Sequence, residues 1–147
     1  MVSSMIAGID PGRWKTGVAF AEGGGELLFS AIVPSEKAEV LVSAFKSGEW
    51  GALDRWGLEG EIKNIAGLTA EKIYVGGGTS SKEFTKNFPL EYITVDEYGT
   101  TLAARKIYWR LHRPRGIMKL IPTSLRTPPR NVDDLAAYAI ILKACAD

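Results

Sequence analysis

Cysteine and histidine are scarce in this sequence of 147 residues, which contains one of each, Cys145 and His112. A single cysteine cannot form an internal disulfide, and the two side chains together cannot complete the ligand shell of a structural zinc ion. Long hydrophobic runs are also missing, because the longest apolar stretch, residues 135–142, is far too short to span a bilayer. The N-terminus lacks the charged segment and long apolar stretch of a signal peptide. We therefore expect a cytoplasmic protein with no disulfide, zinc site or membrane span.

Acidic residues are absent from residues 98–132, although the net charge of the whole sequence is only +1. The bases of this interval, called the basic window below, are Arg105, Lys106, Arg110, Arg113, Arg115, Lys119, Arg126 and Arg130. Such a concentration of positive charge favours a polyanionic partner. The plainer interpretation is a solvated helix face followed by a loop. We predict that nucleic acid is bound by Lys15, Arg105, Arg110, Arg113, Arg115 and Lys119.

The composition is that of one ordinary globular domain covering residues 1–147. Hydrophobic residues make up 46% of the chain and charged residues 24%, which is enough to bury a core and excludes disorder over most of the length. No internal repeat or low-complexity tract divides the sequence. We expect a monomer or a homodimer.

Periodicity and turn residues predict an α/β domain with a mixed sheet. Strands are expected at 4–9, 16–21, 26–33, 72–75 and 92–96, the first three as an antiparallel meander. Helices are expected after Ser35, which would act as the N-cap, and at 50–68, 80–88, 100–112 and 132–144. We expect Leu58, Ile62 and Ile65 on one stripe of the second helix, and Leu102, Ile107 and Leu111 to face inward from the helix at 100–112. Residues 113–130 hold four prolines and predict a long basic loop.

Carboxylates occur where three of these elements begin or end. Asp10 ends the first strand, Asp96 and Glu97 lie at the end of a later strand, and Asp133 and Asp134 open the final helix. Strand ends and helix starts at one edge of an α/β sheet meet at a single crevice. Strand alternation sends Asp96 and Glu97 to opposite faces, so only one of them can join Asp10.

Grouped carboxylates repel one another unless a cation lies between them, and hard oxygen ligands suit Mg²⁺ or Mn²⁺. Two such ions can activate water and stabilise the leaving oxygen of a phosphodiester. The sequence therefore combines a candidate metal site with a candidate grip for a polyanion. The plainer interpretations are that Asp10 caps a turn and that Asp133 and Asp134 complement the helix macrodipole.

Three motifs resemble those of a known family. Residues 8–12, Gly-Ile-Asp-Pro-Gly, with Thr16-Gly17 after them, resemble the opening motif of RuvC Holliday-junction resolvases. Residues 95–101 with Ala104 are similar to the DERLTT…EA stretch of the related YqgF/RuvX proteins, and residues 132–137 with 140–142 are similar to their VDxxAAxxIL motif. The motifs follow in the family's order and span nearly the whole chain.

This resemblance implies a ribonuclease H-like fold, with a mixed five-stranded sheet flanked by helices. It also implies an endonuclease dependent on Mg²⁺ or Mn²⁺ that acts on branched DNA or precursor ribosomal RNA. Carried over by position, the catalytic metal ligands would be Asp10, Glu97 and Asp133, with Asp134 as the alternative third ligand.

Two positions depart from the family pattern. Tyr98 stands where the YqgF group usually has arginine, and a glycine-rich segment at 75–81 replaces its GLPxxxDG loop. These departures keep a second hypothesis open, an inactive nucleic-acid-binding module of the same fold. Glycines 76–78 are typical of a plain strand-to-helix turn, or less specifically of a phosphate-binding nest. An actin-like ATPase is disfavoured because its nucleotide lies between two domains of this kind.

Overall fold

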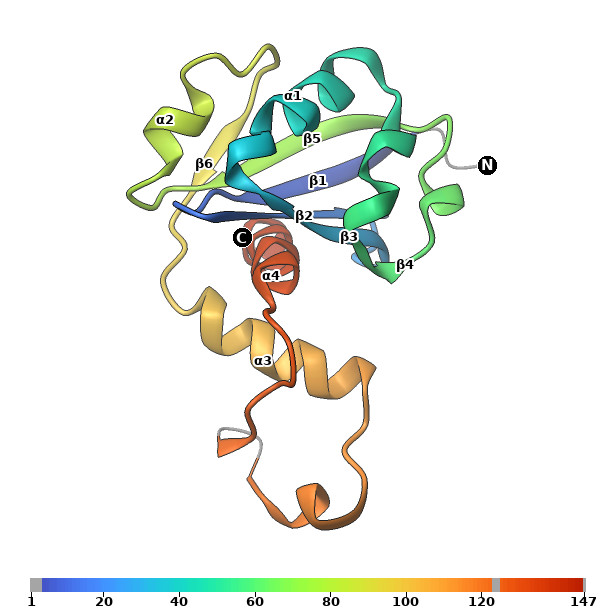
Figure 1. Cartoon of the computed structure of the whole chain (residues 1–147), viewed down its shortest axis with the longest axis vertical. Coiled ribbons are helices and arrows are strands. Elements are labelled where there is room, and N and C mark those ends of the chain that lie inside the picture. Colours follow the sequence, from blue (N-terminus) through green and yellow to red (C-terminus); the bar gives the residue numbers. More distant parts are fainter. Residues whose placement is uncertain (1–3, 123–124, 147) are drawn as a thin grey trace.

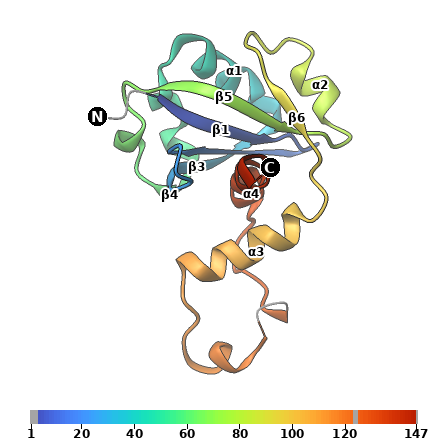
Figure 2. The same ribbon diagram turned by 180° about the vertical axis from the view of Figure 1, so that it is seen from behind.

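The computed structural model describes residues 4–122 and 125–146, in which one mixed sheet of six strands has helices on both faces (Figures 1 and 2). The strand order is β4-β3-β2-β1-β5-β6. The strands are β1 (Ser4–Asp10), β2 (Lys15–Ala21), β3 (Leu27–Pro34), β4 (Gly57–Gly60), β5 (Thr69–Gly76) and β6 (Ile93–Val95). Strands β1 to β4 pair antiparallel in chain order, and β5 and β6 lie parallel to β1.

The helices divide into two layers. Helix α1 (Ala38–Ser47) and the 3₁₀ helix η2 (Trp50–Trp56) cover one face of the sheet, and α4 (Asp133–Ala146) crosses the other (Figure 1). Helix α3 (Thr100–Leu111) packs on the outer side of α4, and the chain after it extends away from the sheet (Figure 2). The short elements are η1 (Ser35–Lys37), η3 (Ile62–Asn64), α2 (Ser81–Thr85) and η4 (Gly116–Leu120).

The larger core lies between the sheet and the α1 layer. Phe20 on β2 is fully buried, and its ring centroid lies 4.9 Å from that of Trp50 and 5.8 Å from that of Phe45. Aromatic side chains of this size bury large apolar areas and supply much of the hydrophobic stabilisation of a small domain. This cluster fixes the sheet on which the carboxylates are placed.

Helix α4 lies unusually close to β1 and β2 because glycine faces it from both strands. A Cβ on Gly8 would collide with the carbonyl oxygen of Ala137, and one on Gly17 would collide with that of Asp133. The register pairs Gly17 with Asp10. The first turn of α4 is therefore held beside the end of β1, and the two glycines of the opening motif are needed for this packing.

The expected strands are all present with small shifts of their ends, but the sheet has one strand more than the five expected. Residues 50–68 do not form the expected helix. They form η2, the edge strand β4 and η3, with Leu58 exposed on β4. Gly60 has a φ of 73°, which favours glycine and ends any regular helix there. Contact with β3 thus overrides the helical periodicity of this segment.

Two further expectations about helices are wrong in detail. Leu102 and Leu111 are 46% and 45% exposed, whereas α3 buries Ala104, Ile107 and Tyr108 against α4. Neither leucine belongs to the hydrophobic cluster that α3 forms with α4. Ser35 does not cap a helix through its side chain. Its hydroxyl donates a 2.7 Å hydrogen bond to the carbonyl of Gly12 instead.

None of the helices within residues 4–122 and 125–146 has the length and hydropathy needed to cross a membrane.

Candidate carboxylate site

Asp10 and Glu97 come from strands on either side of β5 and meet at one edge of the sheet. Asp10 is the last residue of β1, and Glu97 follows β6. Both residues are half-buried, and the Glu97 carboxyl group lies in position to form a hydrogen bond with that of Asp10. Burial, then the charge of Glu97 and this hydrogen bond, then the charge of Asp133, raise the pKa of Asp10 to about 7. Without a cation, the Asp10 carboxyl group therefore keeps its proton to a higher pH than an ordinary aspartate does.

Glycines 76–78 make room for Glu97. A Cβ on Gly76 would lie 2.9 Å from Oε2 of Glu97, and one on Gly78 would collide with Oε1. Gly76 pairs with Val95 in the register of β5 with β6, which brings the two segments together. The glycine run thus forms a strand-to-helix turn, as expected, and a side chain at Gly76 or Gly78 would also displace the Glu97 carboxylate.

The backbone of Glu97 is fixed by the start of α3. Its carbonyl oxygen accepts hydrogen bonds from the Thr100 amide at 3.0 Å and the Thr100 hydroxyl at 2.7 Å. Gly99, with a φ of 81°, makes the turn between them. The turn formed by residues 97–100 therefore fixes the backbone from which the Glu97 carboxyl group extends toward Asp10.

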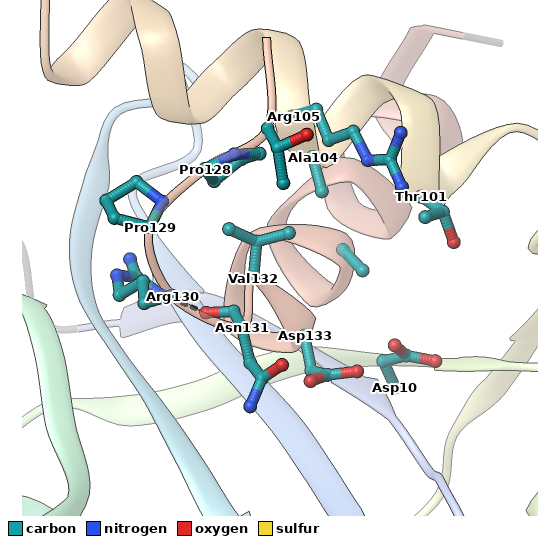
Figure 3. A pocket seen from close by; sticks show the side chains of 12 residues that line it. Asp10, Thr101, Ala104, Arg105, Pro128, Pro129, Arg130, Asn131, Val132 and Asp133 are labelled. Carbon is teal, nitrogen blue, oxygen red and sulfur yellow. Dashed lines mark hydrogen bonds between the residues drawn. The ribbon is translucent and has the colours of Figure 1, made fainter.

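Asp133 faces a pocket of about 540 Å³ that Asp10 also lines (Figure 3). The pocket lies between the first turn of α4 and helix α3, which contributes Thr101 and Arg105. Burial raises the pKa of Asp133, while the charge of Lys15 opposes the shift. Asp133 therefore approaches the Asp10–Glu97 pair from the helix side of the pocket.

Asp134 and Asp96 are turned elsewhere. Asp134 is completely buried, and its two oxygens accept hydrogen bonds of 2.6 Å from the Ser30 hydroxyl and 2.8 Å from Nη1 of Arg130. The Asp96 side chain is 80% exposed, and its Oδ2 lies 3.9 Å from Nζ of Lys143. From the pair Asp96 and Glu97, it is Glu97 that faces Asp10. From the pair Asp133 and Asp134, it is Asp133.

Arg130 leaves the basic window to join a network that sequence reasoning missed. Its Nη2 lies 2.6 Å from Oε2 of Glu59, which also lies 2.7 Å from Nε2 of His112. Burial lowers the pKa of Arg130, but the hydrogen bonds and charges of Asp134 and Glu59 together raise it above its ordinary value. The network ties edge strand β4 to the ends of α3 and α4. No motif marks Glu59, whose role depends on the unexpected strand β4.

The remaining predicted nucleic-acid contacts fall into two groups. Lys15 and Arg105 lie beside the carboxylates, Lys15 acting on Asp133 through its charge and Arg105 lining the pocket. Further out, α3 and the segment after it expose Arg110, Arg113, Arg115 and Lys119. Tyr108 is buried and stacks on His112, so within this window it packs in the core.

The donor chemistry fits a hard divalent cation, because Asp10, Glu97 and Asp133 offer only carboxylate oxygens. As they stand in the described part of the chain, no three or more His, Cys, Asp or Glu side chains are grouped closely enough to hold one metal ion. The close unit is the Asp10–Glu97 pair. A cation at this point would be held first by these two residues, with Asp133, which lines the same pocket as Asp10 (Figure 3), as a further carboxylate nearby.

No family model matches this chain, and a search of curated proteins gives no significant match.

Proposed function

We propose that this protein is a Mg²⁺- or Mn²⁺-dependent endonuclease that hydrolyses phosphodiester bonds of structured nucleic acid, either branched DNA or precursor ribosomal RNA. One observation supports this most directly. Two acids remote in sequence, Asp10 and Glu97, lie so close together that burial and the charge of Glu97 raise the pKa of Asp10, and the charge of Asp133 acts on the same group. Such crowding of carboxylates is typical of sites that function with a bound cation.

The residues around the pair would divide the work. Asp10, Glu97 and Asp133 would hold the ions, whose chemistry is the activation of water and the stabilisation of the leaving oxygen. Arg105 and Lys15 flank the carboxylates and would hold phosphate groups on either side. The exposed bases after α3 would bind the backbone farther from the scissile bond.

The proposal is tested by cleavage assays in Mn²⁺ on a four-way DNA junction, duplex DNA, single strands and an RNA stem–loop. Asp10→Asn and Glu97→Gln should each abolish cleavage, because they remove ligands while keeping the shape of the side chain. Asp96→Asn is the matched control, since Asp96 points to Lys143 and should leave cleavage unchanged. Equal cleavage by wild type and Asp10→Asn would assign the activity to another site or a contaminant.

A second candidate is a binding module of the same fold without turnover. The absence of a three-ligand group among the described residues favours it. This candidate predicts that junction DNA or RNA binds tightly, that no substrate is cut, and that Mn²⁺ leaves the melting temperature unchanged. The same set of variants and substrates therefore decides between the two functions.

A further inference from the structure

A second pocket, of about 450 Å³, adjoins the carboxylate pocket. The two pockets share Arg130 and Asn131 as lining residues, so they lie on either side of this segment. The second pocket is formed by the turn between β1 and β2 and by the end of η2. We call it the tryptophan groove, since Trp14 comes from the turn and Trp56 from η2.

Trp14 is exposed to an unusual degree for its type. Its side chain is 74% exposed, whereas the other three tryptophans, all within the described residues, are buried or half-buried. A large aromatic surface in water carries a hydrophobic cost that a ligand would remove. The guanidinium of Arg13 lies over the indole at 5.0 Å, which leaves the rest of the ring surface open.

The turn that carries Trp14 is held in place. The Ser35 amide donates a 2.9 Å hydrogen bond to the Trp14 carbonyl, and the Ser35 hydroxyl donates to the Gly12 carbonyl. That hydroxyl also lies 3.0 Å from the hydroxyl of Thr16. An exposed ring on a fixed turn is prepared for binding, since little backbone freedom remains to be lost.

The charge of the groove is positive. Lys15 and Arg55 line it, Arg13 lies next to it, and no acidic residue is among its lining residues. Within residues 4–122 and 125–146, none of these three basic side chains forms an ion pair. The guanidinium of Arg55 lies over the Trp56 ring at 4.7 Å, and Arg55 is exposed to solvent. Aromatic faces interleaved with positive charges match the two parts of a nucleotide, the base and the phosphate.

We propose that the tryptophan groove binds an unpaired nucleotide of the substrate, with the base stacked on Trp14 and the phosphate held by Lys15 and Arg55. This inference rests on the proposed function and narrows its substrate. A paired base inside a duplex has both faces covered by its neighbours, so stacking on Trp14 requires a base that is single-stranded, frayed or flipped out. The groove therefore selects nucleic acid with an unpaired segment beside the bond that is cut.

Lys15 links the groove to the carboxylate site. It lines the groove and its charge also acts on Asp133. A strand that occupies the groove is thus led to the carboxylates within a short stretch of backbone. The selected substrate is a junction or a structured RNA with a single-stranded arm, in preference to a fully paired duplex.

Equilibrium binding in EDTA tests the groove without cleavage. The probes are a fluorescently labelled oligothymidylate, an oligouridylate of equal length and a blunt duplex. Trp14→Ala should raise the Kd for both single strands about 5- to 100-fold and change that for the duplex less than twofold. Trp14→Phe should restore most of the affinity, because it keeps an aromatic face. Single strands should quench tryptophan fluorescence in wild type and lose this effect in Trp14→Ala.

Tyr92→Ala is the matched control. Tyr92 is 38% exposed and packs on Phe88, next to β6 at the sheet edge opposite β4. It should leave every Kd within twofold of wild type, and the thermal transition of Trp14→Ala should match wild type. An unchanged single-strand Kd in Trp14→Ala overturns the inference, as does an equal loss on the duplex.

The outcomes separate the two proposals. Loss of single-strand binding in Trp14→Ala, with no cleavage by wild type in Mn²⁺, would support the groove and refute the nuclease. Unchanged binding in Trp14→Ala, with cleavage that depends on Asp10, would refute the groove and support the nuclease.

Discussion

The Ser30 hydroxyl donates a 2.6 Å hydrogen bond to Oδ2 of Asp134, whose carboxylate is completely buried. This bond joins the middle of β3 to the first turn of α4. Arg130 completes the pairing from the other side. A buried carboxylate needs such partners, because burial of an unpaired charge is costly. The adjacent Asp133 faces the pocket instead. Two consecutive aspartates thus have separate tasks.

Substitution by asparagine should separate these tasks. Asp134→Asn should lower the free energy of unfolding by about 2–4 kcal/mol, since Arg130 loses the charge of its completely buried partner. It should keep any response of the folded protein to Mn²⁺. Asp133→Asn should cost about 1 kcal/mol or less and weaken the Mn²⁺ response. Urea titrations with and without Mn²⁺ measure both effects, and the reverse pattern would assign the ligand role to Asp134.

The Asp10–Glu97 pair should make the metal-free protein less stable as the pH rises. The pKa of Asp10 is about 7 in the folded state against 3.8 for an ordinary aspartate, so the folded protein binds more protons between these values. Stability is therefore lost between about pH 4 and pH 7. Asp10→Asn should remove this pH dependence. The free energy of unfolding of the variant, relative to that of wild type, should therefore rise across the interval by on the order of 3 kcal/mol.

Urea unfolding in EDTA at a series of pH values measures this difference. Asp96→Asn provides the control, because the Asp96 side chain is largely exposed and its replacement should change stability by no more than about 0.5 kcal/mol. A difference between Asp10→Asn and wild type that does not vary with pH would show that the two carboxyl groups are not crowded in solution.

A divalent cation bound to the Asp10–Glu97 pair should restore the stability that the metal-free protein loses at high pH. At pH 8, above the pKa of about 7 of Asp10, Mn²⁺ bound to the pair would stabilise the folded state by mass action, by about 2.7 kcal/mol at a hundred times its Kd. The melting temperature of wild type should therefore rise with millimolar-range Mn²⁺. Asp10→Asn and Glu97→Gln should lose this rise and Asp96→Asn should keep it. An anomalous peak at Asp10 and Glu97 in Mn²⁺-soaked crystals would locate the ion.

The sequence predicts those elements of the structure that depend on residues near one another in the chain. Turn residues and alternation predict the strands, and alternation correctly allows only one of Asp96 and Glu97 to reach Asp10. The same reasoning leaves Asp133 and Asp134 undecided, because the choice depends on a contact of Asp134 with Ser30, which lies 104 residues away in the sequence, and on how Arg130 folds back onto the helix start. It also mistakes β4 for helix, since an edge strand that begins and ends in glycine has little pattern of its own.

Gly17 is needed for close packing against α4, and the sequence alone does not predict this role. Its place in the motif is visible, whereas its closeness to the Asp133 carbonyl depends on where α4 lies. Gly17→Ala should push the first turn of α4 off the sheet, lower the unfolding free energy by about 1–3 kcal/mol and reduce cleavage through displacement of Asp133. Gly24→Ala is the control, because nothing lies within 4 Å of a Cβ there. Equal stability of the two variants would contradict the close packing.

The exposed bases after α3 should contribute to binding mainly through counterion release. Arg110, Arg113 and Arg115 are exposed and lie beyond the pocket, so they suit binding to phosphates rather than to the reacting bond. Their joint replacement by alanine should flatten the plot of log K against log salt by about one unit for each phosphate group that is no longer neutralised.

Replacement of the exposed Lys37, Lys46 and Lys72, which lie outside the basic window, lowers the net charge equally and should change the slope much less. If both triple variants flatten the slope alike, the effect comes from net charge and not from this arm. A change confined to the first variant would place the nucleic-acid backbone along α3 and the segment that follows it, on the side from which Arg105 enters the pocket.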